Sequence, residues 1–150
     1  MSATPPRFTP LPPWPCVRID GQAAGQLVLE LAAGRPLILA SAPGIAGLAG
    51  AGWWAALGKG LQQDGVLLLL DAVDQMGQVL AALRAGVPAI AFAPPAAMPD
   101  DGIGRLLGLA AAHGATLYQR PAHAIEPCWI RNRDASLRQW LSQQLDIQGM

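Results

Sequence analysis

Apolar residues at helical spacing alternate with short, uninterrupted apolar runs along the chain from residue 20 onward. Apolar residues that recur every three or four positions predict helices, and short uninterrupted runs predict buried strands. The predicted helices span residues 20–34, 50–63, 74–85, 101–113 and 134–146. The predicted strands span residues 36–41, 66–70, 88–92 and 115–118. The pattern therefore indicates a repeated helix–strand unit.

A glycine separates each of the first four predicted helices from the strand that follows it. These glycines are Gly34, Gly65, Gly86 and Gly114. Helices commonly end on a residue with a left-handed backbone, which glycine adopts at the lowest cost. The glycines therefore predict that each helix stops and the chain turns directly into the next strand.

The predicted strands are apolar without alternation, which is typical of parallel sheets buried on both faces. Helices between successive strands make right-handed crossovers, so all the strands can run parallel. We therefore predict a three-layer α/β domain with a mostly parallel sheet of about four strands flanked by helices. A half-barrel of βα units is the alternative, because short loops such as residues 71–73 also suit barrel units.

One segment resembles a known kind of unit. Residues 71–92, with the run Ala81-Ala82-Leu83-Arg84-Ala85-Gly86-Val87, are similar to a βα unit of aldolase-type barrels. The resemblance covers this unit alone. The single lysine of the chain, residue 59, is predicted on a helix, so no strand-borne Schiff-base lysine accompanies it. No functional residue is carried over from that family.

The N-terminal region differs in composition from the rest of the chain. Six prolines fall within residues 1–17, which predicts an extended arm over residues 1–19 followed by a single α/β domain over residues 20–150. The arm is expected to pack Phe8 and Trp14 onto the domain or onto a neighbouring molecule. Prolines in place of a continuous apolar leader also predict a cytoplasmic protein.

Charge is sparse in this chain. The formal net charge is zero and charged residues make up 13%, against about 25% in typical soluble domains. Without a basic block to neutralise phosphates, we expect no nucleic-acid partner. The uncharged stretch of residues 36–58 is interrupted by Pro43 and several glycines, so we expect no membrane span. A surface this poor in charge favours coverage by another subunit.

The predicted helix of residues 101–113 carries two neighbouring stripes of uncharged residues. The first consists of Ile103, Leu106, Leu107 and Ala110, and the second of Gly104, Gly108, Ala111 and Ala112. The first stripe suits the core of the domain, and the small residues of the second allow another helix to approach closely. The sequence therefore predicts a homodimer that forms through this helix.

Several polar residues follow the predicted strands, where loops and helix N-termini meet at the carboxyl edge of a parallel sheet. The candidates for ligand binding are Ser41, Gly44, Gly47, Asp71 and Arg120, and those for catalysis are Asp71 and His123. Backbone amides of the glycine-rich loop after residue 41 would suit a phosphate. In the alternative interpretation, the loop is a packed turn, the aspartate caps a helix, and the arginine and histidine are solvated.

No spacing of His and Cys typical of a zinc site is present, and we expect neither a metal nor a cofactor. Cys16 and Cys128 are expected to be buried free thiols. Two functions stay open. The favoured hypothesis is a non-catalytic assembly or partner-binding module with room for a small ligand at the carboxyl edge of the sheet. The alternative is an enzyme or binding protein for a small metabolite, such as a phosphorylated one.

Overall fold

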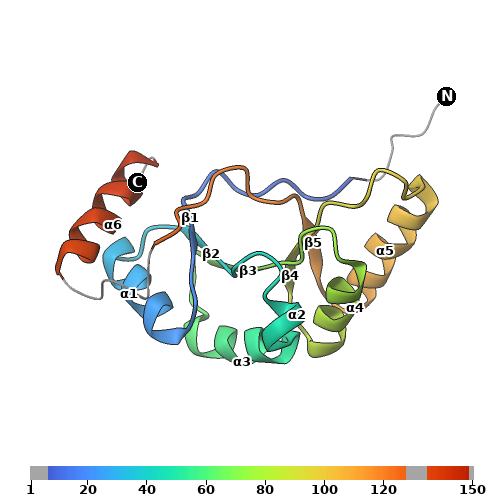
Figure 1. Ribbon diagram of the computed structural model, residues 1–150, viewed down its shortest axis with the longest axis horizontal. Coiled ribbons are helices and arrows are strands. Elements are labelled where there is room, and N and C mark those ends of the chain that lie inside the picture. Colours follow the sequence, from blue (N-terminus) through green and yellow to red (C-terminus); the bar gives the residue numbers. More distant parts are fainter. Residues whose placement is uncertain (1–6, 128–134, 149–150) are drawn as a thin grey trace.

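The computed structural model describes residues 7–127 and 135–148 of the chain (Figure 1). The strands are β1 (Cys16–Arg18), β2 (Leu37–Ala40), β3 (Val66–Asp71), β4 (Ala89–Ala91) and β5 (Thr116–Tyr118). The helices are α1 (Gln22–Ala32), α2 (Ala46–Ala49), α3 (Ala51–Leu61), α4 (Met76–Ala85), α5 (Asp100–Ala112) and α6 (Ala135–Ile147).

The four helix-ending glycines have the predicted backbone conformation. Their φ angles are positive, from 71° to 82°. Gly86 is the clearest case, because it directly follows α4 and its amide donates to the carbonyl oxygen of Leu83 over 3.2 Å. We expected α1 to begin near residue 20, but its N-cap residue is Gly21. No side chain, including that of Asp20, makes a capping hydrogen bond there.

The five strands form one parallel sheet in the order β1-β2-β3-β4-β5. The prediction of an α/β domain with a parallel sheet is confirmed, with one strand more than the four expected. Right-handed crossovers that always step in the same direction emerge on the same face of a sheet. Accordingly α1, α3, α4 and α5 lie along one face, with α6 beside α1 at the end of this layer (Figure 1).

The opposite face of the sheet is covered by two extended stretches, which we call the N-terminal segment (residues 7–15) and the crossing segment (residues 119–127). Both run across the sheet in the same direction, from the β5 side to the β1 side (Figure 1). Thr9 of the N-terminal segment bonds to the edge of β5, since its amide donates to the carbonyl oxygen of Leu117 over 2.9 Å. Ile125 of the crossing segment bonds to the edge of β1 in the same way, through Cys16 and Arg18.

The sheet therefore has helices on one face, extended segments on the other and a backbone partner at each edge. The unpaired edge of a sheet can bind strands of other molecules. The bridges pair backbone groups at the outer edges of both β1 and β5 and so make such binding less favourable. The strand β1 and the N-terminal segment occupy most of the region predicted as an arm. Phe8 is buried with its ring centre 5.8 Å from that of Phe92, and Trp14 packs on the covered face of the sheet.

Apolar side chains fill both sides of the sheet. The larger core lies between the helices and the sheet and includes Trp54, Leu61, Leu70 and Ile90. The smaller core lies under the two extended segments and consists of Cys16, Ile38, Ala40, Leu69, Ala89 and Ala91. Uninterrupted apolar strands result from this arrangement, because alternate side chains enter alternate cores.

The helix α6 docks on α1 through part of the predicted apolar stripe. Leu141 and Leu145 are fully buried, whereas Trp140 is 40% exposed. The side chain of the fourth predicted residue, Leu137, lies outside the described residues. An ion pair between Arg138 and Glu30, 3.2 Å long, flanks the contact. The stripe is thus narrower than predicted.

Within the described residues, no helix is both long enough and apolar enough to cross a membrane.

We expect Gly25→Ala to destabilise the protein by up to about 2 kcal/mol, because overpacking a core costs about 1–3 kcal/mol and alanine recovers about 1 kcal/mol of helix propensity. A Cβ atom at position 25 would lie 2.5 Å from Cδ1 of the buried Leu61. Gly52→Ala is the matched control on α3, because a Cβ atom there meets nothing within 4 Å. Urea unfolding of both variants tests this, and equal stabilities would contradict it.

Candidate functional site

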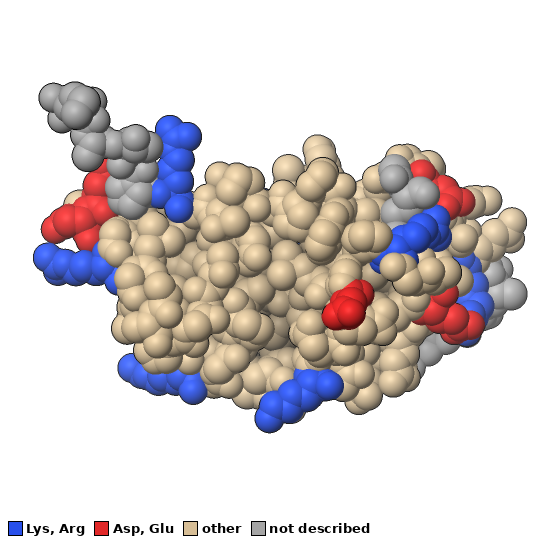
Figure 2. Space-filling view, turned by 180° about the vertical axis from the view of Figure 1, so that it is seen from behind, with Lys and Arg blue, Asp and Glu red and all other residues tan. Residues whose placement is uncertain are grey.

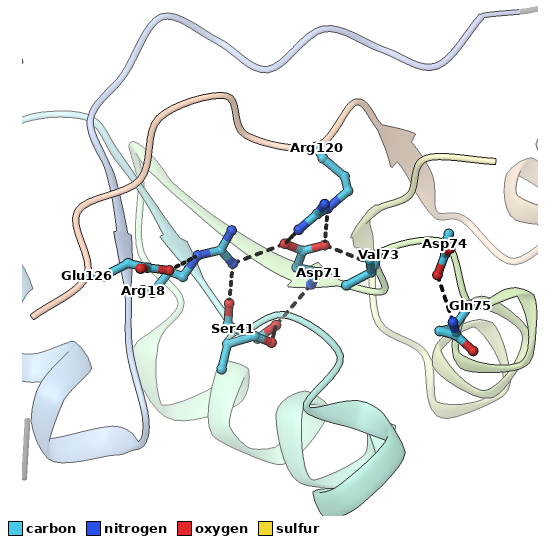
Figure 3. A network of polar contacts seen from close by, with 9 residues as sticks. Arg18, Ser41, Asp71, Val73, Asp74, Gln75, Arg120 and Glu126 are labelled. Atoms are coloured by element: carbon cyan, nitrogen blue, oxygen red, sulfur yellow. Dashed lines mark hydrogen bonds and ion pairs between the residues drawn. The ribbon is translucent and has the colours of Figure 1, made fainter. Parts of the chain in front are cut away.

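Side chains from four parts of the chain meet at the carboxyl edge of the sheet (Figure 3). Arg18 ends β1, Ser41 follows β2, Asp71 ends β3, and Arg120 reaches down from the crossing segment. Parallel strands bring their carboxyl ends to one edge, which explains why residues so far apart in sequence meet here. We call these four residues and Glu126 the edge network.

Asp71 is the centre of the edge network. Its Oδ1 atom accepts hydrogen bonds from Nε of Arg120 over 2.9 Å and from the amide of Val73 over 3.0 Å. Its Oδ2 atom accepts from Nη2 of Arg120 over 3.0 Å and lies 3.1 Å from Nη1 of Arg18. The two oxygens thus have four donors, which is the full capacity of a carboxylate.

Burial and the neighbouring positive charges shift the pKa of Asp71 in opposite directions. Its side chain is completely buried. Burial acts to raise the pKa of Asp71, but the hydrogen bonds from Arg120 and Val73 and the charges of both arginines outweigh it and hold the pKa below its ordinary value of 3.8. The same hydrogen bond raises the pKa of Arg120. Asp71 is therefore an ionised, sealed carboxylate and is poorly suited to accept a proton.

Arg18 joins three elements at this edge. Its Nη1 atom donates to the carbonyl oxygen of Ser41 over 2.7 Å, and its Nε atom lies 3.1 Å from a carboxylate oxygen of Glu126. The hydroxyl of Ser41 accepts the amide of Asp71 over 2.9 Å and donates to the carbonyl oxygen of Ala42 over 3.0 Å. The hydroxyl of Ser41, predicted to bind a ligand, is thus engaged in backbone contacts.

The aspartates near α4 do not cap it. The N-cap position of α4 is Gln75, and no side chain donates or accepts a capping hydrogen bond there. Asp71 instead accepts the amide two residues later, which fixes a tight turn before the helix. In this turn Val73 has a φ of 57°, a conformation that is costly for a β-branched residue. The bond to Asp71 helps to hold it.

The glycine-rich loop after Ser41 uses its amides within the chain. The amide of Gly44 donates to the carbonyl oxygen of Asp71 over 3.0 Å, and that of Gly47 donates to the carbonyl oxygen of Gly44 over 3.1 Å. A Cβ atom at position 47 would lie 2.9 Å from Nε2 of Gln78. This close approach by α4 explains a glycine at position 47. The loop packs as a turn, and the phosphate-binding role of Gly44 and Gly47 stays a prediction.

His123 lies apart from the edge network. It lines a cleft of about 530 Å³ between the N-terminal segment and the crossing segment, together with Cys16. A second cavity, of about 190 Å³, opens beside Arg18 and Glu126, and Asp71 does not line it. The structure therefore brings Asp71, Arg120 and Ser41 together and places the other catalytic candidate, His123, elsewhere.

Three residues that contact each other or Asp71 at this edge, Arg18, Glu126 and Val73, were not predicted from the sequence. Arg18 and Glu126 lie in regions predicted as arm and loop, and Val73 carries no chemical signal. The charge of Arg18, the first arginine after the prolines, is the one signal that could have prompted a search for a partner. Within residues 7–127 and 135–148, no cluster of three or more His, Cys, Asp or Glu side chains suits a metal ion.

Comparison of the chain with protein-family models, with curated proteins and with solved structures finds no match. Any function must therefore be inferred from the geometry of the chain's own residues.

Proposed function

We propose that this protein is a non-catalytic assembly module that forms a homodimer through the outer face of α5. The observation that carries the proposal is the small-residue stripe on this helix. Its members Gly104, Gly108, Ala111 and Ala112 are all exposed in the monomer, as is Leu109 on the same helix.

Packing inside the monomer does not require the two glycines of this stripe. A Cβ atom at Gly104 or Gly108 would meet no atom within 4 Å. Each glycine in the interior of a helix costs about 1 kcal/mol relative to alanine. A second copy of α5 that packs against this stripe would explain why both positions are glycine, because a glycine has no side chain to hold the second helix away. A twofold axis through the stripe would pair the same surface on both subunits.

Charged side chains are unevenly distributed over the surface. Figure 2 shows a face with uncharged surface over much of its middle, with one acidic side chain to the right of the middle and with charged side chains along the lower rim and at both ends, including the end at which α5 lies. An exposed ion pair between Arg105 and Asp101, 3.5 Å long, lies on the same side of α5 as Gly108 and Ala112. A second copy of α5 would therefore contact this ion pair as well as the small residues.

The edge network favours a non-catalytic role. Asp71 is sealed and fully bonded, and both arginines at the edge pair with it. A phosphorylated metabolite at this edge would compete with a buried carboxylate for Arg18 and Arg120. The alternative function would be favoured if inorganic phosphate raised the melting temperature of the wild type and not that of Arg120→Ala.

The assembly is tested with Gly108→Arg, which places a long charged side chain in the middle of the stripe. Light scattering after size exclusion at micromolar concentration should show a dimer for the wild type and a monomer for this variant. Gly77→Arg is the matched control on α4, where a Cβ atom also meets nothing within 4 Å, and it should remain dimeric. A wild type that stays monomeric at high concentration, or two variants that behave alike, would refute the proposal.

A further inference from the structure

The cleft on the covered face of the sheet has the dimensions of a ligand site. Its volume is about 530 Å³, and small-molecule sites typically occupy about 300–1,000 Å³. Residues 11–14 of the N-terminal segment and 121–123 of the crossing segment form its walls. Cys16 and Ile38 of the sheet form its floor, and Gln148 after α6 completes the lining.

Both walls of the cleft are fastened to the sheet. The N-terminal segment is held by the bonds of Thr9 to β5 and by its Pro15 carbonyl, which accepts the amide of Ile38 over 2.8 Å. The crossing segment is held by the ion pair of Arg120 with Asp71 and by the bonds of Ile125 to β1. A cleft with fixed walls loses little conformational entropy when a ligand enters.

The chemistry of the lining selects an uncharged ligand. None of the lining side chains is an Asp, Glu, Lys or Arg. A charged ligand would lose its hydration in this cleft without gaining a counter-charge. The floor is neutral as well, because burial raises the pKa of the Cys16 thiol to about 11.

The walls of the cleft offer flat surfaces and a few polar groups. Trp14 is half-buried and lies among prolines of both walls, so ring faces are available for stacking. His123 and Gln148 supply side chains that can donate or accept a hydrogen bond. We propose that this cleft binds an uncharged, flat aromatic small molecule. The site is independent of α5 and of the proposed assembly.

The proposal is tested with two fluorophores that share one ring system. N-phenyl-naphthylamine is uncharged, and anilinonaphthalene sulfonate adds one negative charge to the same rings. Titration of the full chain should give saturable binding of the uncharged probe with one site per chain. The sulfonate should bind at least about tenfold more weakly, because its charge finds no partner in the cleft. Equal affinities, or no binding of the uncharged probe, would overturn the proposal.

Variants locate the binding site. Ala122→Trp fills the cleft and should weaken the uncharged probe at least about tenfold, whereas Ala56→Trp, at an exposed position on α3, should leave its affinity unchanged. His123→Ala removes one hydrogen-bonding group and should weaken the probe by about two- to tenfold. If Ala122→Trp and Ala56→Trp bind the probe equally, the cleft is not its site.

A chemical readout keeps the test independent of fluorescence. In a Cys128→Ser background, saturating uncharged probe should slow the reaction of Cys16 with a disulfide reagent at least about fivefold, because this buried thiol reacts only when the cleft opens and the bound probe stabilises the closed state. Gly108→Arg should not alter this protection, which separates the cleft from the α5 surface. Unchanged thiol reactivity with the probe bound would place the probe outside the cleft.

Discussion

Asp71→Ala should lower the free energy of unfolding by about 3–5 kcal/mol, since removal of one partner of a buried ion pair leaves its counter-charges without compensation. Arg18, whose side chain is 11% exposed, and Arg120 would both lose an acceptor. Asp71→Asn keeps the shape of the side chain but turns an amide nitrogen toward a guanidinium, so we expect a loss nearly as large. Urea unfolding measures both.

Asp74→Ala is the matched control for this loss. Asp74 is exposed in the same loop, where it accepts the side chain of Gln75 over 2.7 Å, and its charge acts on Arg120 less strongly than that of Asp71 does. Its replacement should change stability by no more than about 0.5 kcal/mol. If Asp71→Ala cost as little, the edge network would not stabilise the fold.

The effect of Asp71 should also depend on pH with a defined sign. Its pKa in the folded protein is held below 3.8, so the carboxylate stabilises the fold fully above that value. The stabilisation is lost as pH falls below 3.8 through the folded pKa, because the folded state must then take up the proton that the unfolded state already binds. The difference in stability between the wild type and Asp71→Asn should therefore narrow in acid. A constant difference from pH 6 to pH 2 would contradict this.

Leu141→Ala should destabilise the protein by about 2–5 kcal/mol, the cost of a cavity at a fully buried leucine. Leu141 has no exposed surface and lies where α6 packs on α1. Hydrogen exchange should show the amides of α6 losing protection first, because this helix has few other attachments.

Ile147→Ala is the control on the same helix. Ile147 is 75% exposed, so its truncation removes little buried surface and should change stability by no more than about 0.5 kcal/mol. Equal losses at both positions would mean that α6 is not docked through Leu141.

The order of helices and strands could be predicted because its signals are local. Gly86 lies between an apolar pattern of helical spacing and a short apolar run, a combination that indicates the end of a helix, and the uninterrupted apolar run before Asp71 indicates a buried strand. The strand β1 could not be predicted in this way. Its three residues follow a proline-rich stretch, and they become a strand only through pairing with β2 and with the distant Ile125.

The candidate site was predicted in part for the same reason. Asp71 and Arg120 each follow a predicted strand, and their meeting requires only that the carboxyl ends share an edge. The pairing with Arg18 depends on a strand that local signals do not reveal. His123 lies only three residues beyond Arg120, yet the crossing segment has by then left the edge and entered the cleft wall. Proximity in sequence did not imply proximity in the site.

The attachment of the two extended segments to the edge strands has a consequence for how the chain folds. The backbone bridges from Thr9 to Tyr118 and from Val17 to Ile125 each join residues near opposite ends of the described chain. Contacts between residues so far apart in sequence require closure of the longest loops, which slows their formation. The helix–strand units between them can assemble from short-range contacts. During synthesis, the outer edge of β1 must therefore wait for its partner until almost the whole chain has left the ribosome.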